Sequence, residues 1–348
     1  MKTIEELLEL SLSKNASDLH LMPGLPPMLR IDGKLVRQDE LDVLSVDRVK
    51  QLIYHTMTID QQQLFESKLV FEFALHMPKI GNFRVSALHQ MHGVSAVFRV
   101  IPERVPTFEE LGLPPVLKAL LALQHGLILV TGPTGSGKST TLASMIDYIN
   151  TQQSAHIITI EDPIEYIHPC KKSAINQLQV GRDTPDVDTA LKSSLRQDPN
   201  VILIGELRDL ETIRLALTAA ETGHLVMSTL HASSCPLAIS RIIDIFPSHE
   251  KNRVRNLLAE TLQAVICQEL VQRTSGGRVA AFEIMLATPA IRHLIRQDMT
   301  THMESTIQTS GDIGMCSLEQ YLNQLVSKRI ISTATMRTVI GNRGNFIL

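Results

Sequence analysis

The stretch Gly132-Pro133-Thr134-Gly135-Ser136-Gly137-Lys138-Ser139-Thr140 decides the fold of this 348-residue chain. It fits the pattern G-x-x-x-x-G-K-[ST], follows the apolar run 126–130 and precedes a helix-like segment at 141–146. A glycine-rich loop between a strand and a helix lets successive backbone N–H groups point at phosphate oxygens. The sequence therefore predicts a nucleoside triphosphate site, with Lys138 at the β- and γ-phosphates and the Ser139 hydroxyl on Mg²⁺.

The remainder of the chain supports this interpretation of the loop, because strand-like and helix-like segments alternate from residue 116 onward. Such alternation is typical of a parallel sheet covered by helices, which is an α/β fold. Strands are expected over 127–130, 156–160, 201–204 and 225–230, and helices over 138–150, 186–196 and 209–221.

Three further regions flank this α/β domain, which is expected over 116–288. Residues 1–100 predict a small α+β domain, because Ile4, Leu7, Leu8 and Leu12 recur at helical spacing and apolar residues alternate at 83–87 and 94–100. Asp32-Gly33 between two short apolar runs indicates a hairpin. The proline-rich stretch 101–115 is the best linker candidate, and 289–348 predicts a helical subdomain.

Two carboxylates follow apolar strands of the expected sheet. Glu161 comes after the run 156–160, and Glu206 follows the run 201–204. In an open α/β sheet, ligands bind beyond the carboxyl ends of the strands, where the phosphate loop also lies. Taken singly, each residue fits an ordinary surface carboxylate, but the upstream phosphate loop favours catalysis. We expect Glu161 to act as the base or to position the attacking water, and Glu206 to hold Mg²⁺ through bound water.

Two histidines and two arginines are further candidates. His231 lies at the carboxyl end of the expected strand 225–230, where an imidazole can sense the γ-phosphate, and His224 lies at the weaker position before it. A lone histidine is more often structural, so both interpretations stay open. Arg84 and Arg99 lie opposite the apolar face of two expected strands, and from the residues alone a solvated face is the simpler interpretation.

Composition excludes several classes of protein. With 44% hydrophobic residues, a net charge of −3 and no tryptophan, the chain is globular and does not favour nucleic acid as a partner. No apolar run approaches the roughly 20 residues that cross a bilayer, and the first six residues carry acids where a signal peptide needs an apolar start. We therefore expect a cytosolic protein. Four cysteines without a C-x-x-C pair predict reduced thiols rather than a structural zinc site.

Ordered motifs around the phosphate loop resemble one family, the secretion-superfamily ATPases of the type IV pilus retraction class, or PilT-like motors. Residues 16–21 (ASDLHL) are similar to its N-terminal signature, and 160–165 (IEDPIE) to its Asp box. Residues 205–209 (GELRD) are similar to its Walker B motif, 222–231 to its His box, and 277–285 to a further family segment. The resemblance covers nearly the whole chain.

The resemblance implies a RecA-like ATPase domain, a PAS-like N-terminal domain and a homo-hexameric ring with ATP and Mg²⁺ at the subunit interfaces. By this analogy Glu161 is the catalytic glutamate, and Arg84 and Arg99 are arginine fingers that act on a neighbouring subunit. The implied partner is an inner-membrane pilus platform protein, with a paralogous retraction ATPase as a further candidate. The motor would work in the cytoplasm, recruited to the inner membrane, and drive twitching motility.

Several features favour retraction over extension or secretion. The chain is short, lacks the four-cysteine metal element of the extension and secretion relatives, and carries 290–296 (AIRHLIR), which is similar to a motif associated with retraction. His293 stands for the usual Asn, Ala232 for the usual Thr, and Asn82 where Arg is common, which leaves an accessory paralogue or a related machine open. An assembly or secretion motor, a nucleotide-gated scaffold and a DNA-translocating ring would also carry a phosphate loop. The two carboxylates argue against the scaffold, and the acidic balance argues against the DNA ring.

Overall fold

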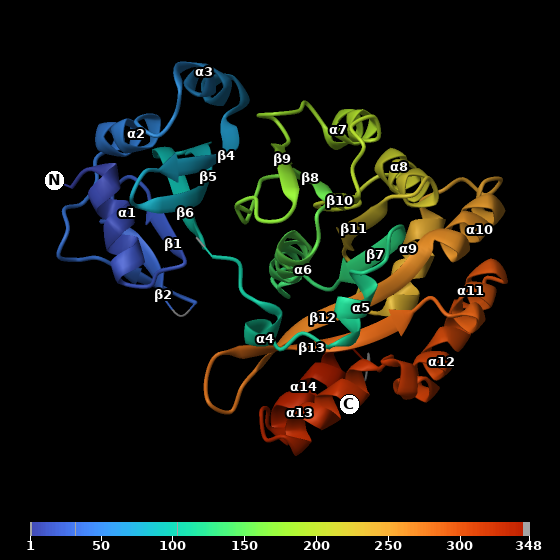
Figure 1. Ribbon diagram of the computed structural model, residues 1–348. Coiled ribbons are helices and arrows are strands. Elements are labelled where there is room, and N and C mark those ends of the chain that lie inside the picture. The colour runs from blue at the N-terminus through green and yellow to red at the C-terminus, as the bar shows by residue number, and fades with distance from the viewer. Residues whose placement is uncertain (1, 32, 103, 344–348) are drawn as a thin grey trace. The chain divides into compact units, whose positions relative to one another are not determined.

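The computed structural model describes residues 2–31, 33–102 and 104–343, which form two compact units. The N-terminal unit contains Met1–Arg104 together with the short segment Pro163–Ile167, and the second unit contains Val105–Asp162 and His168–Leu348. Figure 1 shows that each unit has a sheet of its own. No helix in the described part of the chain is both long enough and apolar enough to span a bilayer.

The N-terminal unit is an antiparallel sheet with the strand order β3-β2-β1-β6-β5-β4. Its strands are β1 (Asp18–Leu21), β2 (Met28–Ile31), β3 (Lys34–Arg37), β4 (Val70–Met77), β5 (Gly81–Gln90) and β6 (Gly93–Ile101). Its helices are α1 (Ile4–Ser13), α2 (Val46–Tyr54) and α3 (Ile59–Lys68). Thr3 and Thr58 begin α1 and α3 with capping boxes, in which side chains satisfy the first free N–H groups.

The predicted alternation in this unit is confirmed. Phe83, Val85 and Ala87 of β5 are completely buried in the core, because alternate residues of a strand point to the same face of the sheet. The predicted hairpin is also present, since Ile31 pairs with Lys34 across its turn. Asp32, which belongs to the predicted hairpin, lies outside the described residues.

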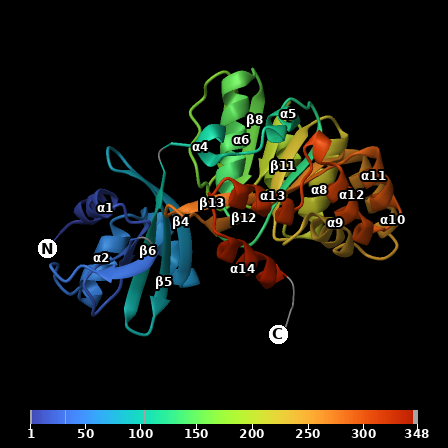
Figure 2. The same ribbon diagram turned by 90° about the horizontal axis from the view of Figure 1, so that it is seen from below.

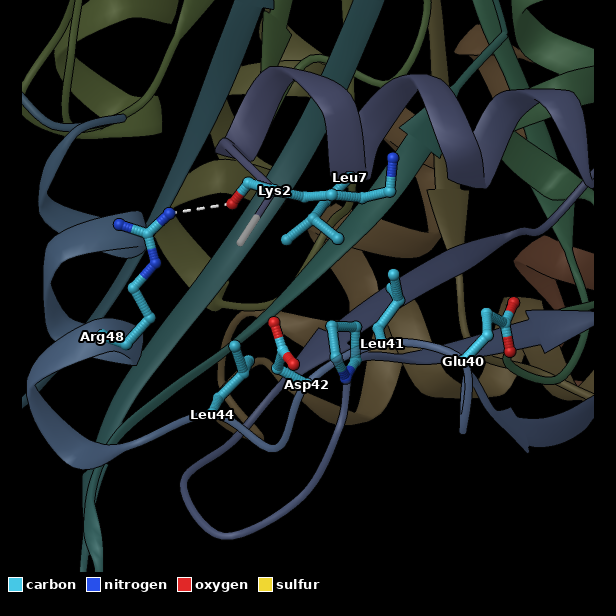
Figure 3. A pocket seen from close by; sticks show the side chains of 8 residues that line it. Lys2, Leu7, Glu40, Leu41, Asp42, Leu44 and Arg48 are labelled. Carbon is cyan, nitrogen blue, oxygen red and sulfur yellow. Dashed lines mark hydrogen bonds between the residues drawn. The ribbon is translucent and has the colours of Figure 1, made fainter.

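A pocket in the N-terminal unit, shown in Figure 3, contains none of the predicted site residues. Its lining includes the apolar side chains of Leu7, Leu41 and Leu44. At its edge, Arg48 Nη2 donates a hydrogen bond of 2.8 Å to the carbonyl oxygen of Lys2, which ties α2 to the residues before α1. The pocket therefore belongs to the packing of the first helices and not to the predicted nucleotide site.

The second unit is built on a sheet with the order β13-β12-β7-β11-β10-β8-β9, parallel except for β13. Its strands are β7 (Gly126–Thr131), β8 (His156–Glu161), β9 (Ala174–Gln179), β10 (Val201–Ile204), β11 (Leu225–Leu230), β12 (Leu262–Gln272) and β13 (Arg278–Leu286). The central strands β7, β10 and β11 are buried along their whole length, as parallel strands covered on both faces must be.

Helices cover both faces of this sheet. Along β7, Leu127 and Leu129 face one core, and Ile128 and Val130 face another. The first core is closed by α7 (Val187–Ser194), α8 (Leu210–Glu221), α9 (Cys235–Asp244), α10 (Lys251–Thr261), α11 (Pro289–Arg296) and α12 (Met303–Thr309). The second is closed by α4 (Phe108–Leu111), α5 (Val116–Leu120) and α6 (Lys138–Gln152).

The C-terminal part is helical, as predicted, apart from two short 3₁₀ turns at Thr300–His302 and Gly311–Ile313. Helix α13 (Leu318–Ser327) packs against β13, and α14 (Thr333–Arg343) joins α13 in a small core of its own (Figure 2).

The expected strands and helices of the α/β domain are all present, whereas β9, β12 and β13 were not predicted. The stretch 101–115 differs from a plain linker, because Ile101 ends β6 and α4 forms within it. Thr107 caps α4 through a capping box, a local signal that the prolines obscured. The bounds of the four predicted regions, 1–100, 101–115, 116–288 and 289–348, themselves remain predictions.

Candidate functional site

The glycine-rich loop between β7 and α6 adopts a conformation that only glycine accommodates. Gly132, Gly135 and Gly137 all have positive φ angles, of 140°, 77° and 88°. A Cβ atom on Gly132 would lie 2.2 Å from the carbonyl oxygen of Gln268 on β12, closer than any atom can approach. The loop is therefore wrapped tightly around its own interior, and α6 begins directly after it at Lys138.

The polar groups of this loop fit an anionic guest. Lys138 is buried, and its Nζ donates to the carbonyl oxygens of Gly132 and Pro133 at 3.0 Å each. The hydroxyl of Ser136 is buried without a hydrogen-bond partner among the described residues. A buried hydroxyl without a partner is costly unless a ligand or water satisfies it, so these groups match the phosphate oxygens that the loop is predicted to bind. Ser139 and Thr140 follow in the first turn of α6, half-buried.

Glu161 is the last residue of β8, and its carboxylate accepts hydrogen bonds from two neighbouring side chains. Its Oε1 accepts a hydrogen bond of 2.7 Å from Thr159 Oγ1 on the same strand. It also accepts a longer one of 3.4 Å from Gln177 Nε2 on the neighbouring strand β9. Hydrogen bonds from a hydroxyl and an amide fix the direction of a carboxylate, as the predicted role of positioning water would require.

Glu206 lies just beyond β10 and is held on both of its oxygens. His231 Nε2 lies 3.0 Å from Oε1, and Arg208 Nε donates to Oε2 at 2.7 Å. The hydrogen bond with Glu206 raises the pKa of the Arg208 guanidinium. The backbone before Glu206 is fixed by the N–H of Gly205, which donates to the carbonyl of Ile160 at 2.8 Å. Glu206 and His231, predicted separately, are therefore brought into direct contact.

The register of the parallel strands gathers these groups at one edge of the sheet. Thr131 of β7 pairs with Leu230 of β11, and Ile204 of β10 pairs with Ile160 of β8. Each of these residues ends its strand or lies next to its end, so whatever follows them emerges at the same carboxyl edge. The residues that follow are Gly132, Glu161, Glu206 and His231. His224 lies at the other end of β11, where its Nδ1 is 2.9 Å from the carbonyl of Ala219, which is a structural role.

Arg84 and Arg99 lie on the sheet of the N-terminal unit. The register of β5 and β6 places them directly opposite each other, and β1 places Asp18 opposite Arg99. Arg84 pairs with Glu72 at 2.8 Å and more loosely with Glu165 at 3.8 Å. The described structure therefore gives Arg84 carboxylate partners within its own unit and leaves its proposed role towards phosphate untested.

Asp18 holds Arg99 in place. Arg99 Nε donates to Asp18 Oδ1 at 2.8 Å, and Arg30 lies 3.5 Å from the other oxygen. Burial raises the pKa of the Asp18 carboxyl, but the hydrogen bonds from Arg99 and Ser17 outweigh burial, so its pKa lies below the usual value. This carboxylate stays charged at neutral pH and fixes the guanidinium of Arg99 on the surface of the sheet.

Sequence reasoning missed three residues of the site edge. Arg208 was visible within the GELRD motif, but nothing in the motif showed that its side chain turns back to Glu206. Gln177 and Gln268 lie on β9 and β12, the strands that were not predicted. Among the described residues no cluster of three or more His, Cys, Asp or Glu side chains is suited to a metal ion.

A phosphate loop between β7 and α6, with carboxylates after the neighbouring strands of a parallel sheet, defines a RecA-like P-loop ATPase domain. The family model for type II/IV secretion system proteins matches residues 1–325. The chain therefore belongs to this family of ATPases, and the resemblance to its PilT-like members is confirmed.

Two relatives illustrate the similarity in sequence. The chain is 53% identical over 334 residues to the type IV pilus retraction ATPase PilT of Pseudomonas aeruginosa, spanning 96% of this chain and 97% of the relative. It is 46% identical over 312 residues to a twitching motility protein of Neisseria gonorrhoeae, spanning 89% of this chain and 83% of that protein.

Solved structures agree with these relatives. The crystal structure of the pilus retraction motor PilT with bound ADP superimposes with a TM-score of 0.91 at 42% identity, over 97% of each chain. The ATPase DotB of Legionella pneumophila follows at a TM-score of 0.82 and 26% identity, over 97% of this chain and 95% of that one. The mixed α/β fold with its parallel sheet is thus the fold of this ATPase family.

Proposed function

We propose that this chain is the subunit of a hexameric ATPase motor that powers type IV pilus retraction. Two relatives that match over most of their length are named for pilus retraction and twitching motility, and the PilT structure holds ADP. Within this chain, the observation that supports the proposal best is the single sheet edge shared by the phosphate loop, Glu161, Glu206 and His231. ATP hydrolysis needs phosphate binding, a metal ion and a water-positioning group in one place.

The loop and Lys138 bind the nucleotide in this proposal. Backbone N–H groups of the loop face the phosphates, and Lys138 exchanges the carbonyl oxygens of Gly132 and Pro133 for phosphate oxygens. The cost of giving up these two hydrogen bonds is offset because a charged phosphate is a stronger acceptor than a carbonyl.

Glu161 positions the attacking water and accepts its proton. Thr159 and Gln177 fix the direction of the carboxylate, so the water is oriented before the transition state forms. Most of the catalysis in phosphoryl transfer comes from positioning and charge stabilisation. A small change in the direction of the Glu161 carboxylate would therefore lower the hydrolysis rate.

Ser139 and Glu206 are the residues that would hold Mg²⁺, Glu206 through bound water. Both supply oxygen ligands, which Mg²⁺ prefers. When bound, Mg²⁺ offsets the charge that develops on the transferred phosphoryl group. Glu206 presents its carboxylate between His231 and Arg208, and His231 is placed to follow the state of the γ-phosphate through this shared carboxylate.

The hexamer completes the site in this proposal. Arg84 and Arg99 lie side by side on one face of the N-terminal sheet, and we propose that they contact the nucleotide of the adjoining subunit. Two guanidinium groups can stabilise the equatorial charge of the transition state, as arginine fingers do. The ring would act from the cytoplasm on an inner-membrane pilus platform protein.

A deletion strain of the source bacterium tests the retraction function. It is complemented with wild-type protein or with the Lys138→Ala variant, and surface filaments are imaged along with twitching. Retraction predicts excess immobile filaments in the deletion strain and rescue by wild type but not by Lys138→Ala. Bald cells would instead indicate an assembly motor, and unchanged filaments would point to secretion.

A further inference from the structure

Gln268 of β12 connects two parts of the phosphate loop region. Its Nε2 donates to the carbonyl oxygen of Ser136 at 2.7 Å, and its Oε1 accepts from the hydroxyl of Thr141 in α6 at 2.6 Å. The side chain is almost completely buried, and β12 lies next to β7, the strand that leads into the loop. One side chain is thus hydrogen-bonded both to the loop just before α6 and to the first turn of α6 itself.

The bond to Ser136 determines the direction of a neighbouring N–H group. A trans peptide is planar, so the carbonyl of Ser136 and the N–H of Gly137 point in opposite directions. Because Gln268 holds the carbonyl on its own side, the N–H of Gly137 is turned away from β12. The side away from β12 is the interior of the loop, where phosphate oxygens are expected.

The packing around Gln268 leaves this peptide little room to turn. A Cβ atom on Gly137 would lie 2.9 Å from Gln268 Nε2, and one on Gly132 would lie 2.2 Å from the Gln268 carbonyl. Both glycines therefore allow close contact with this one residue of β12. The remaining glycine of the loop, Gly135, has open space at its Cβ position and no such contact.

A glutamine is the side chain that fits this position. Its amide carries a donor group (NH₂) and an acceptor oxygen side by side, and each makes a hydrogen bond here. If Gln268 served stability alone, its substitution should lower the unfolding temperature without weakening ADP binding, as is expected for the substitution of its partner Thr141. The two hydrogen bonds can be separated by substitution, which makes the two roles distinguishable.

We propose that Gln268 is a positioning residue of the nucleotide site, which holds the Ser136–Gly137 peptide so that the Gly137 N–H faces the phosphates. The proposal rests on the nucleotide-binding function proposed above and adds β12 to the elements that shape the site. Gln268 does not touch the nucleotide; it acts through the loop backbone.

The test measures affinities for ADP and AMP by calorimetry, and unfolding temperatures without nucleotide, on full-length variants. Gln268→Glu keeps the acceptor for Thr141 but replaces the donor to Ser136 with an anionic oxygen. Thr141→Val removes only the other hydrogen bond. Gln272→Glu, at an exposed position of the same strand, is the matched control. Gln268→Met keeps a similar side-chain volume but makes neither hydrogen bond. It decides between the two roles if the buried glutamate of Gln268→Glu prevents folding.

We expect Gln268→Glu and Gln268→Met to bind ADP at least tenfold more weakly, while AMP affinity changes less than threefold, because the loop N–H groups serve the β-phosphate. Thr141→Val should lower the unfolding temperature but keep ADP affinity within threefold. ADP affinity within threefold of wild type in a folded Gln268→Met variant would overturn the proposal. So would an equal loss for ADP and AMP. If the wild type binds ADP no better than Lys138→Ala does, the proposed nucleotide-binding function is wrong, and the proposal for Gln268, which rests on it, is wrong as well.

Discussion

Glu161 and Glu165 lie four residues apart in the same acidic stretch, but their surroundings give them different roles. Glu161 ends β8 and is oriented by Thr159, whereas Glu165 belongs to the segment of the N-terminal unit and faces Arg84. Glu161→Gln should keep nucleotide affinity within threefold, because the loop is untouched. It should lower the ATP hydrolysis rate by about 10² or more, the usual contribution of a general base.

Steady-state phosphate release and ADP binding measure the two quantities, with Glu221→Gln, at the exposed last residue of α8, as the control of equal charge change. The control should keep most of its basal hydrolysis rate. Hydrolysis by Glu161→Gln at the wild-type rate would reject the assignment of Glu161 as the base.

His168 makes the stability of the second unit depend on pH. It is buried, and burial lowers its pKa from 6.5 to about 4, although Asp147 opposes this shift and Lys171 adds to it. Between pH 6.5 and 4, the His168 imidazole becomes protonated in the unfolded chain but stays neutral in the folded chain. Stability from this residue is therefore complete above pH 6.5 and decreases as the pH falls through that window, by up to about 3 kcal/mol.

Urea unfolding at pH 7 and pH 4.5 checks this prediction on wild type and on His168→Phe, which keeps a ring but cannot titrate. The wild type should lose more free energy of unfolding on acidification than the variant does. Met299→Phe, which introduces the same ring at an exposed position without a titratable group, is the control. Equal pH dependence in wild type and His168→Phe would show that His168 is not responsible.

At the scale of elements, burial decides which strands could be predicted. The strands β7, β10 and β11 are covered on both faces and form continuous apolar runs, so the sequence predicts them and the carboxylates after them. The edge strand β9 has the sequence AINQLQ and is only partly buried, so it carries no such run. Strand β12 follows α10 without a break, since α10 ends at Thr261 and β12 begins at Leu262.

The same difference explains which site residues could be predicted. Glu161, Glu206 and His231 follow predicted strands, and this position together with the phosphate loop made them candidates. Gln177 and Gln268 act from the middle of β9 and β12, and their roles depend on which strands become neighbours. Strand order is set by packing between distant segments, which local patterns do not record.

The loop before α6 provides a prediction at this scale, because its glycines differ in their surroundings. Gly132→Ala would place a methyl group against the Gln268 carbonyl, and the loop would have to move. Gly135→Ala meets no atom and bears only the backbone cost of a positive φ, about 1–2 kcal/mol. We expect Gly132→Ala to abolish ADP binding and to lower stability by a further ~1–3 kcal/mol.

Calorimetric ADP titration and thermal unfolding of both variants check the difference. Gly135→Ala serves as the matched control, since it changes the same residue type to the same residue at a positive φ. If both variants bind ADP equally well, the tight contact between the loop and β12 does not matter for the site.

At the scale of the whole molecule, the groups proposed to act in catalysis belong to two units. The phosphate loop and its carboxylates belong to the second unit, and Arg84 and Arg99 belong to the N-terminal unit. In a closed ring each interface repeats the same contact, so every site would combine the loop of one subunit with the arginines of another. Two different defects, one in each half of the site, should then complement each other.

Arg84→Ala and Lys138→Ala subunits test this arrangement when they are mixed and allowed to exchange. Each variant alone should hydrolyse ATP at a small fraction of the wild-type rate. In an equimolar mixture about a quarter of the interfaces pair an intact loop with an intact Arg84, so about a quarter of the activity should return. A mixture of Lys138→Ala with Glu161→Gln, two defects in the same half, should restore none. Arg37→Ala on the exposed strand β3 should be active alone. Absence of rescue at every mixing ratio, with subunit exchange verified, would mean that each subunit completes its own site.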